Sequence, residues 1–136
     1  MTLKIVVGDL GFEARLEEAA APRTVAAIRR LLPLRSKLIQ ARWSGEAGWI
    51  PYGALKVGVG VENATSHPAP GHLLLYPGGY SETEILFPYG STLFASKLGQ
   101  LAGNHFATLT GGLDNLPELG RRILWEGAQK ISFEEA

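Results

Sequence analysis

The sequence predicts a mainly-β fold, an all-β barrel or sandwich of about eight strands with two short helices as plugs. Three observations support this fold class. Short apolar or alternating segments recur between glycine- and proline-rich turns, only two segments show helical spacing, and no repeat or linker interrupts the chain. With 136 residues, 46% of them hydrophobic and 19% charged, the chain is predicted to form a single domain over residues 1–136.

The chain is expected to open with a β-hairpin and then a helix. Leu3–Gly8 and Phe12–Glu18 have strand-like patterns, and Asp9–Gly11 between them is turn-like. A helix is predicted over residues 22–32. Its proline, Pro22, fits a first helical turn, and apolar side chains follow at helical spacing.

The middle of the chain is predicted to alternate strands with loops. The expected elements are two strands within residues 36–50 around a two-residue turn at Ser44-Gly45, a loop at residues 56–71, and strands at residues 72–77 and 83–88 around Gly78-Gly79-Tyr80. Residues 91–104 fit no element clearly.

The last third of the sequence predicts a strand, a helix and a closing strand. The strands are expected at residues 105–110 and 129–135. The helix is expected at residues 115–126, with Asp114 or Asn115 as its cap. Glu118 stands three residues after Asn115, as in a capping box, and Gly127 suits a left-handed stop.

The segment RWSGEAGW, Arg42–Trp49, contains the side chains best suited to a binding site. A turn at Ser44-Gly45 would pair Gln40 with Trp49 and Arg42 with Ala47, because cross-strand partners share a face. This register predicts a polar face that holds Leu38, Gln40, Arg42 and Trp49. It predicts an opposite, core-like face that holds Ile39, Ala41, Trp43, Gly48 and Ile50.

Composition argues against several classes of protein. Lys+Arg and Asp+Glu both total 13, so the net charge is zero and no nucleic-acid partner is predicted. Neither a signal peptide nor a membrane span is recognisable, which predicts a cytoplasmic protein without a membrane partner. The sequence has no cysteine, and its three histidines lack metal-ligand spacing, so no metal or cofactor is predicted.

Six residues are predicted to form the site. Arg42 can hold a carboxylate or carbonyl group, with Gln40, Trp49 and Tyr89 as further ligand-binding residues. His105 and Glu46 are the predicted catalytic residues, and His105 is the general acid–base because of its near-neutral pKa. The alternative interpretation is an arginine stacked on tryptophan at an exposed hairpin and a hydrogen-bonded core histidine.

Several segments resemble the cyclophilins. APRTVAAIRRLL (Ala21–Leu32) is similar to the start of the first cyclophilin helix, and HFATLTGGLDNL (His105–Leu116) resembles the stretch before the second. RWSGEA, ENATSHPAPG, LLYPGG and LAGNHFA look like a bacterial cyclophilin-like family of unknown function, over nearly the whole chain. The resemblance implies a cyclophilin-like closed antiparallel β-barrel.

The resemblance also bears on activity. Prolyl isomerases of the cyclophilin family use an arginine, a glutamine and an aromatic pocket, and Arg42 lies on the matching strand. The residues after Arg42 read WSGEAGW instead of the isomerase pattern. The favoured function is therefore binding of a small polar or carboxylate- or amide-bearing ligand, with or without a minor metabolic reaction. The alternatives are a proline-peptide binder or weak prolyl isomerase, and a structural or homo-oligomer-forming domain.

Overall fold

The computed structural model describes residues 2–136. Its strands and helices follow one another along the chain with short connections. They are β1 (Thr2–Val7), β2 (Leu10–Leu16), α1 (Pro22–Leu31), β3 (Leu34–Gln40), the 3-10 turn η1 (Arg42–Ser44), β4 (Gly45–Gly53), β5 (Ala64–Thr65), β6 (His72–Tyr76), β7 (Thr83–Thr92), β8 (Ala95–Ser96), β9 (Gly99–Gln100), β10 (Gly103–Gly111), the 3-10 turn η2 (Leu113–Asn115), α2 (Leu116–Trp125) and β11 (Gln129–Glu135).

Eight antiparallel strands form a closed barrel, as the sequence predicts. Their order around the wall is β2-β1-β11-β3-β4-β7-β6-β10, and the pairing of β10 with β2 closes the ring. Closure removes the unpaired sheet edges that would otherwise expose backbone groups. The short strand β5 adds to β10, while β8 and β9 form a separate hairpin.

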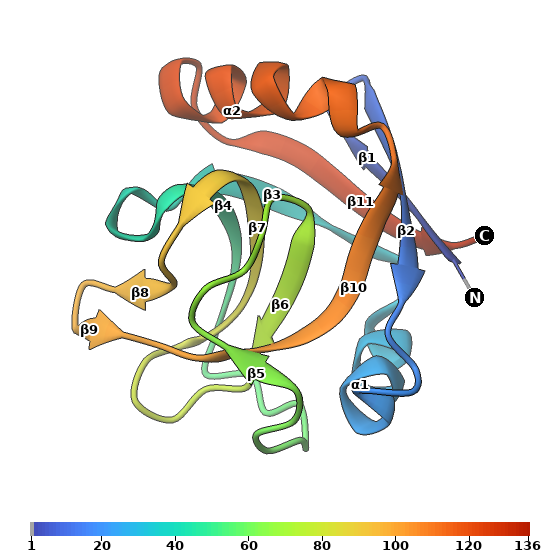
Figure 1. The fold of residues 1–136 in the computed structure, drawn as a ribbon, viewed down its shortest axis with the longest axis vertical. Coiled ribbons are helices and arrows are strands. Elements are labelled where there is room, and N and C mark those ends of the chain that lie inside the picture. Colours follow the sequence, from blue (N-terminus) through green and yellow to red (C-terminus); the bar gives the residue numbers. More distant parts are fainter. Residues whose placement is uncertain (1) are drawn as a thin grey trace.

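The barrel interior is filled by alternate side chains of its strands, because successive residues of a strand point to opposite faces. The largest fully buried interior side chains include Phe87, Phe106 and Phe133. The two helices cover the ends: Figure 1 shows α2 across one end and α1 at the other. Both occupy the predicted segments. No helix within residues 2–136 is both long enough and apolar enough to cross a membrane.

A second apolar cluster lies on the outer face of the wall. Leu74 and Leu86 point away from the interior, since their chain neighbours on both sides belong to the inner core. The cluster consists of Ala41, Ala47, Leu74, Tyr76, Leu86, Phe94 and Leu101, with Trp49 packed against it. Phe94 and Leu101 come from the segment that carries β8 and β9, so this segment covers part of the outer wall (Figure 1).

The second helix has one of its two predicted N-cap residues, Asn115, but the predicted capping bonds do not form. Asn115 stands at the cap position, but its side chain caps nothing in α2 and its Nδ2 instead donates to the carbonyl oxygen of Gly11 at 3.0 Å. Glu118 does not close a capping box, because both of its oxygens accept hydrogen bonds from Arg121 and Arg122. The left-handed stop at Gly127 is confirmed, with φ of +96°.

The predicted turn between β3 and β4 is also wrong. Ser44-Gly45 is not a two-residue hairpin turn; the chain passes through the 3-10 turn η1, whose buried Ser44 Oγ donates to the carbonyl oxygen of Ala95 at 2.8 Å. The register follows from this turn: Trp49 pairs with Ile39 and Gly48 with Gln40. The expected faces of β3 are reversed, since Leu38 is fully buried whereas 37% of Ile39 is exposed. On β4 the expectation is confirmed, because Ile50 lies in the inner core and Trp49 packs on the outer cluster.

Candidate functional site

Gln40 and Tyr89, two of the predicted ligand-binding residues, meet at the barrel end that α2 covers. The Tyr89 hydroxyl donates a hydrogen bond of 2.8 Å to Gln40 Oε1, and Gln40 Nε2 donates to the carbonyl oxygen of Gly45 at 2.8 Å. Burial raises the pKa of the Tyr89 hydroxyl, and the charge of Glu46 raises it further. The phenol is therefore a neutral donor whose oxygen can still accept a hydrogen bond.

Glu46, a predicted catalytic residue, lies beside Tyr89. Its Oε1 accepts a hydrogen bond of 2.8 Å from the backbone N–H of Ser91, so the carboxylate fastens β4 to the end of β7. The neighbouring Gly90 is needed for this contact, because a Cβ there would overlap the carboxylate. Oε2 receives no hydrogen bond from residues 2–136 and is free to accept one from a ligand.

A pocket of 380 Å³ lies between these strands and α2. The barrel side consists of Glu46, Tyr89 and Gly90, and the helix side of Pro117, Gly120, Arg121, Leu124 and Trp125. Gly120 allows the close approach of the two sides, since a Cβ there would overlap the Tyr89 ring.

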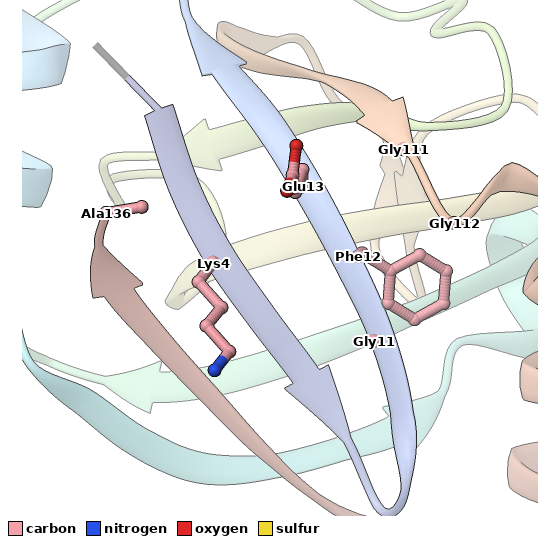
Figure 2. A pocket seen from close by; sticks show the side chains of 7 residues that line it. All are labelled: Lys4, Gly11, Phe12, Glu13, Gly111, Gly112 and Ala136. Carbon is pink, nitrogen blue, oxygen red and sulfur yellow. The ribbon is translucent and has the colours of Figure 1, made fainter.

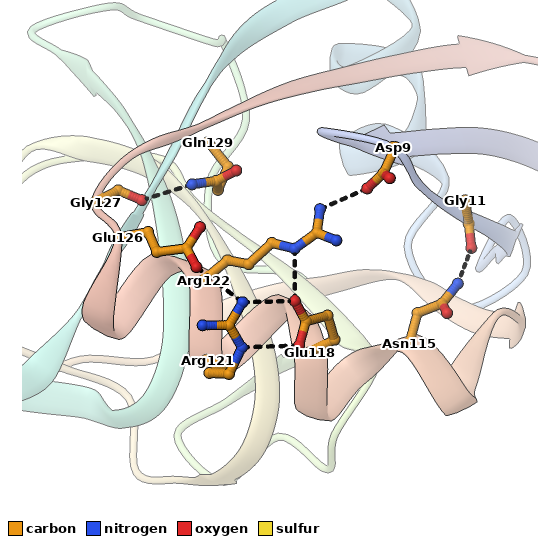
Figure 3. A network of polar contacts seen from close by, with 9 residues as sticks. All are labelled: Asp9, Gly11, Asn115, Glu118, Arg121, Arg122, Glu126, Gly127 and Gln129. Carbon is orange, nitrogen blue, oxygen red and sulfur yellow. Dashed lines mark hydrogen bonds and ion pairs between the residues drawn. The ribbon is translucent and has the colours of Figure 1, made fainter.

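Arg121 and Trp125 are the pocket residues that the sequence analysis missed. Figure 3 shows Arg121 between two carboxylates: it donates to Glu118 at 2.8 and 2.9 Å and pairs with Glu126 at 2.8 Å. These carboxylates raise the pKa of Arg121. Trp125 is 76% exposed. A tryptophan on the polar side of an amphipathic helix was the available signal, because such a ring stays solvent-exposed unless it binds something.

The same helix face is tied to the opening hairpin. Arg122 donates to Glu118 at 2.8 Å and to Asp9, which lies in the β1–β2 turn (Figure 3). The hydrogen bonds from Arg121 and Arg122 lower the pKa of Glu118 to about 2. The network therefore keeps α2 in place over the barrel end and positions Arg121 at the pocket.

Arg42, Trp43 and Trp49 lie outside this pocket. Trp49 packs on the outer apolar cluster, and the exposed Trp43 meets it edge-to-face, with ring centroids 6.1 Å apart. Arg42 is exposed, although its charge still acts on Tyr89. Because Trp49 faces the outer wall and Gln40 the barrel end, the expected single face of Gln40, Arg42 and Trp49 does not exist.

His105 belongs to a different part of the wall. From β4 to β10 the cross-strand partners are Trp49 and Leu86, then Leu86 and Leu74, then Leu74 and His105. Three strand spacings separate Trp49 from His105, roughly 14 Å along the wall. The charged groups that act on the His105 ring are those of His72, Glu17 and Arg15, so the structure does not bring Arg42 and His105 into one site.

His105 is held by a polar chain on the outer wall. Thr108 Oγ1 lies 2.8 Å from His105 Nε2 and donates to Glu17 Oε2 at 2.7 Å. Since Thr108 has a single proton, which it gives to the carboxylate, His105 Nε2 must be the donor to Thr108. The ring also stacks on His72, with centroids 4.5 Å apart and an interplanar angle of 8°.

Replacing His105 is expected to reduce the acid sensitivity of the fold. Burial lowers the pKa of His105 below its ordinary value of 6.5, and His72 lowers it further. The unfolded chain therefore takes up this proton first, and stability is lost as the pH falls from about 7 to 5. Urea unfolding at both pH values should show a smaller loss for His105→Gln than for the wild type. His67→Gln, on an exposed histidine, is the control; an equal effect there would refute the assignment.

A further pocket, of 470 Å³, lies on the outside of the opening hairpin. Figure 2 shows Lys4 and Glu13 there on neighbouring strands, with Gly111 and Gly112 nearby. Lys4 and Glu13 are direct cross-strand partners, which is the usual arrangement of opposite charges on an exposed sheet. None of the predicted site residues lines this pocket, so the pocket under α2 is the better candidate.

Comparisons with known proteins place the chain in a structural context. Residues 3–135 match a family described as a protein of unknown function, DUF3830. No curated protein sequence matches the chain. Among solved structures, McbB in complex with tryptophan aligns with a TM-score of 0.75 and 17% identity over 98% of this chain. The chain spans only 45% of the McbB chain.

A second solved structure has nearly the same length as this chain. It is the hypothetical protein AF2241 from Archaeoglobus fulgidus, with a TM-score of 0.65 and 21% identity, and the alignment covers 100% of this chain and 95% of that one. At these identities the likeness concerns the fold alone. The closed antiparallel barrel is consistent with the cyclophilin-like fold that the sequence resemblance implies.

Proposed function

The chain belongs to the DUF3830 family of proteins of unknown function, and for it we propose binding of a small planar amide or N–H-bearing heterocycle in the pocket under α2. The observation that supports this proposal is the set of groups that line the pocket. A carboxylate and a phenol come from the barrel, and a guanidinium and an exposed indole come from the helix. Together they can satisfy a donor, an acceptor and an aromatic face of one ligand.

Each group has a definite role in this proposal. Glu46 Oε2 accepts a ligand N–H and is the pocket's candidate proton acceptor. Arg121 Nη1, which takes part in none of the contacts with Glu118 and Glu126, donates to a ligand carbonyl oxygen. The ring of Trp125 stacks on the planar part. His105 stays a separate candidate for proton transfer, on the outer wall.

The charges favour an amide over a carboxylate. Arg121 is already paired with Glu118 and Glu126, so little of its positive charge is left for an anion. Glu46 adds a negative charge to the same pocket. Nicotinamide and nicotinate are matched probes for this distinction, because they differ only in the amide and carboxylate groups. Tryptophan, the molecule bound in the McbB structure, is a further probe.

Trp125→Ala is expected to weaken nicotinamide binding by roughly 0.5–1.5 kcal/mol, the scale of an aromatic stacking contact. Titration followed by NMR chemical shifts measures the affinity and locates the ligand. Trp43→Ala is the matched control, because Trp43 is an exposed tryptophan outside the pocket. Equal weakening by both variants, tighter binding of nicotinate than of nicotinamide, or no shift at pocket residues would each count against the proposal.

A further inference from the structure

We propose a second ligand site on the outer wall of the barrel, where the carboxyl group of Glu84 binds the ammonium group of an aromatic amine. This site is separate from the pocket under α2 and rests on different residues. It follows from the position of Glu84, from the absence of a partner for its carboxyl group within residues 2–136, and from the aromatic cluster to which its cross-strand partner Tyr76 belongs.

Glu84 stands on the outward side of β7. Its neighbour Ile85 belongs to the inner core, and Glu84 alternates with it along the strand. The residues directly opposite are Pro51 on β4 and Tyr76 on β6. Only 2% of Glu84 is exposed, so this carboxyl group is built into the wall rather than solvated on it.

The carboxyl group of Glu84 has no hydrogen bond or ion pair among residues 2–136. Other buried polar residues, such as Thr24, Ser44 and Asn104, are bonded through their side chains. Within residues 2–136, every side-chain oxygen that is completely shielded from solvent has a hydrogen-bond partner. The oxygens of Glu84 have none, so they must keep a small area exposed to solvent. Burying a carboxyl group without a hydrogen-bond partner destabilises the folded state, and such groups are found most often at functional sites.

The surroundings of Glu84 favour a cation. Burial, and to a lesser extent the charge of Glu82, raises the pKa of Glu84 to about 8, so the group holds a proton at neutral pH. An ammonium ion supplies N–H donors and a positive charge. Its arrival converts the carboxylic acid to a carboxylate, and the displaced proton passes to solvent.

The ligand body is inferred from the rings of the outer cluster. Tyr76, opposite Glu84, meets Phe94 edge-to-face with ring centroids 6.0 Å apart, and Trp49 packs on the same cluster. Aromatic faces attract ammonium groups, and their apolar surface suits an aromatic body. The expected ligand class is thus a primary amine attached to an aromatic ring.

The loop between β6 and β7 is bonded to this part of the wall. The Tyr76 hydroxyl accepts hydrogen bonds from the N–H groups of Tyr80 and Ser81, at 3.1 and 3.3 Å. The Tyr80 hydroxyl donates to the carbonyl oxygen of Leu98 at 2.6 Å, which links the loop to the β8–β9 hairpin. A cavity of 570 Å³ borders the loop, and Glu82 and Thr83, which immediately precede Glu84, line it. The proposal requires these bonds to open, because Glu84 itself does not line this cavity.

Phenethylamine is the ligand that tests this proposal. 3-Phenylpropanol, which has a similar aromatic body but no charge, is the comparison ligand. Titration of the wild-type protein should change the intrinsic tryptophan fluorescence and release close to one proton per bound amine in weakly buffered solution near pH 6.5. Affinity should rise by up to about tenfold per pH unit as the pH approaches 8. Glu84→Gln should lower the affinity roughly tenfold or more and abolish proton release.

Two controls make the result specific to this site. Glu82→Gln should keep the proton release, and Trp125→Ala, in the pocket under α2, should leave phenethylamine binding unchanged. The proposal is overturned if the amine binds no better than 3-phenylpropanol, if binding releases no proton, or if Glu84→Gln binds it as the wild type does. Proton release is measured on the wild type, so the test holds whatever the variant does to folding.

Discussion

Glu84→Gln is expected to remove most of the decrease in folding stability that the wild-type protein shows as the pH rises from about 5 to 9. In the wild type the pKa of Glu84 rises from 4.5 to about 8, first because of burial and then because of Glu82. The unfolded chain releases this proton at lower pH than the folded protein does. The stability contribution is therefore complete below pH 4.5 and is lost as the pH rises through 8, in total roughly 3–5 kcal/mol. Glutamine, which does not ionise, removes this dependence.

Urea unfolding at pH 5, 7 and 9 measures the effect for the wild type and the variant. Glu82→Gln is the matched control, because it removes a neighbouring charge and leaves the buried carboxyl group in place. The control should keep most of the wild-type pH dependence. A variant with glutamine at position 84 that loses as much stability as the wild type towards pH 9 would show that this carboxyl group is not held in its neutral form.

Asn104→Ala is expected to destabilise the fold by roughly 2–4 kcal/mol, because it leaves several buried groups without partners. Asn104 is 1% exposed and joins three segments. Its Oδ1 accepts from the backbone N–H of Glu62 at 3.1 Å, and its Nδ2 donates to Thr24 Oγ1 and to the carbonyl oxygen of Gly60, at 3.1 and 2.8 Å. No alanine conformation can replace these bonds.

The loss should extend to the first helix. α1 has no side-chain cap of its own, and the carboxylate of Glu62 accepts hydrogen bonds from the N–H and the hydroxyl of Thr24, at 2.8 and 2.7 Å. Asn104 positions this loop. Thr110→Ala, at an exposed position of the same strand, is the control in urea unfolding and should change stability by less than about 0.5 kcal/mol. A similarly small change for Asn104→Ala would contradict the role given to this network.

Much of the fold could be read from local patterns. The helix expected at residues 22–32 forms over Pro22–Leu31, and the one expected at 115–126 forms over Leu116–Trp125. Their apolar stripes and flanking residues are local features, and so are the strand patterns and the glycine turns between them. The closed barrel needed one more source of information, the resemblance of whole segments to the cyclophilins, because strand patterns alone fit a barrel and a sandwich equally well.

The register between β3 and β4 shows where local patterns stop being informative. In this stretch either alternation places some apolar residues inwards, so Ile39 or Leu38 could face the core. The choice depends on Ser44, whose buried side chain bonds to Ala95 on a segment far along the chain. A slip of one residue against β4 moves every β3 side chain to the other face, which is why Gln40 and Trp49 do not share the expected binding face.

The same dependence on distant partners governs the caps and the candidate sites. The side chain that caps α1 comes from Glu62, and the partner of Gln40 is Tyr89, 49 residues further on. Gln40, Glu46 and Tyr89 are candidate residues by side-chain type, but their proximity to one another was not predicted. Arg121, Trp125 and Glu84 have no local signal of comparable strength. The sequence carries the identity of the helices, the strands and the class of fold, since these depend on nearest neighbours. Which polar groups meet, and which carboxyl group is left buried without a partner, follows from closure of the barrel, since only closure brings strands distant in the chain into one register.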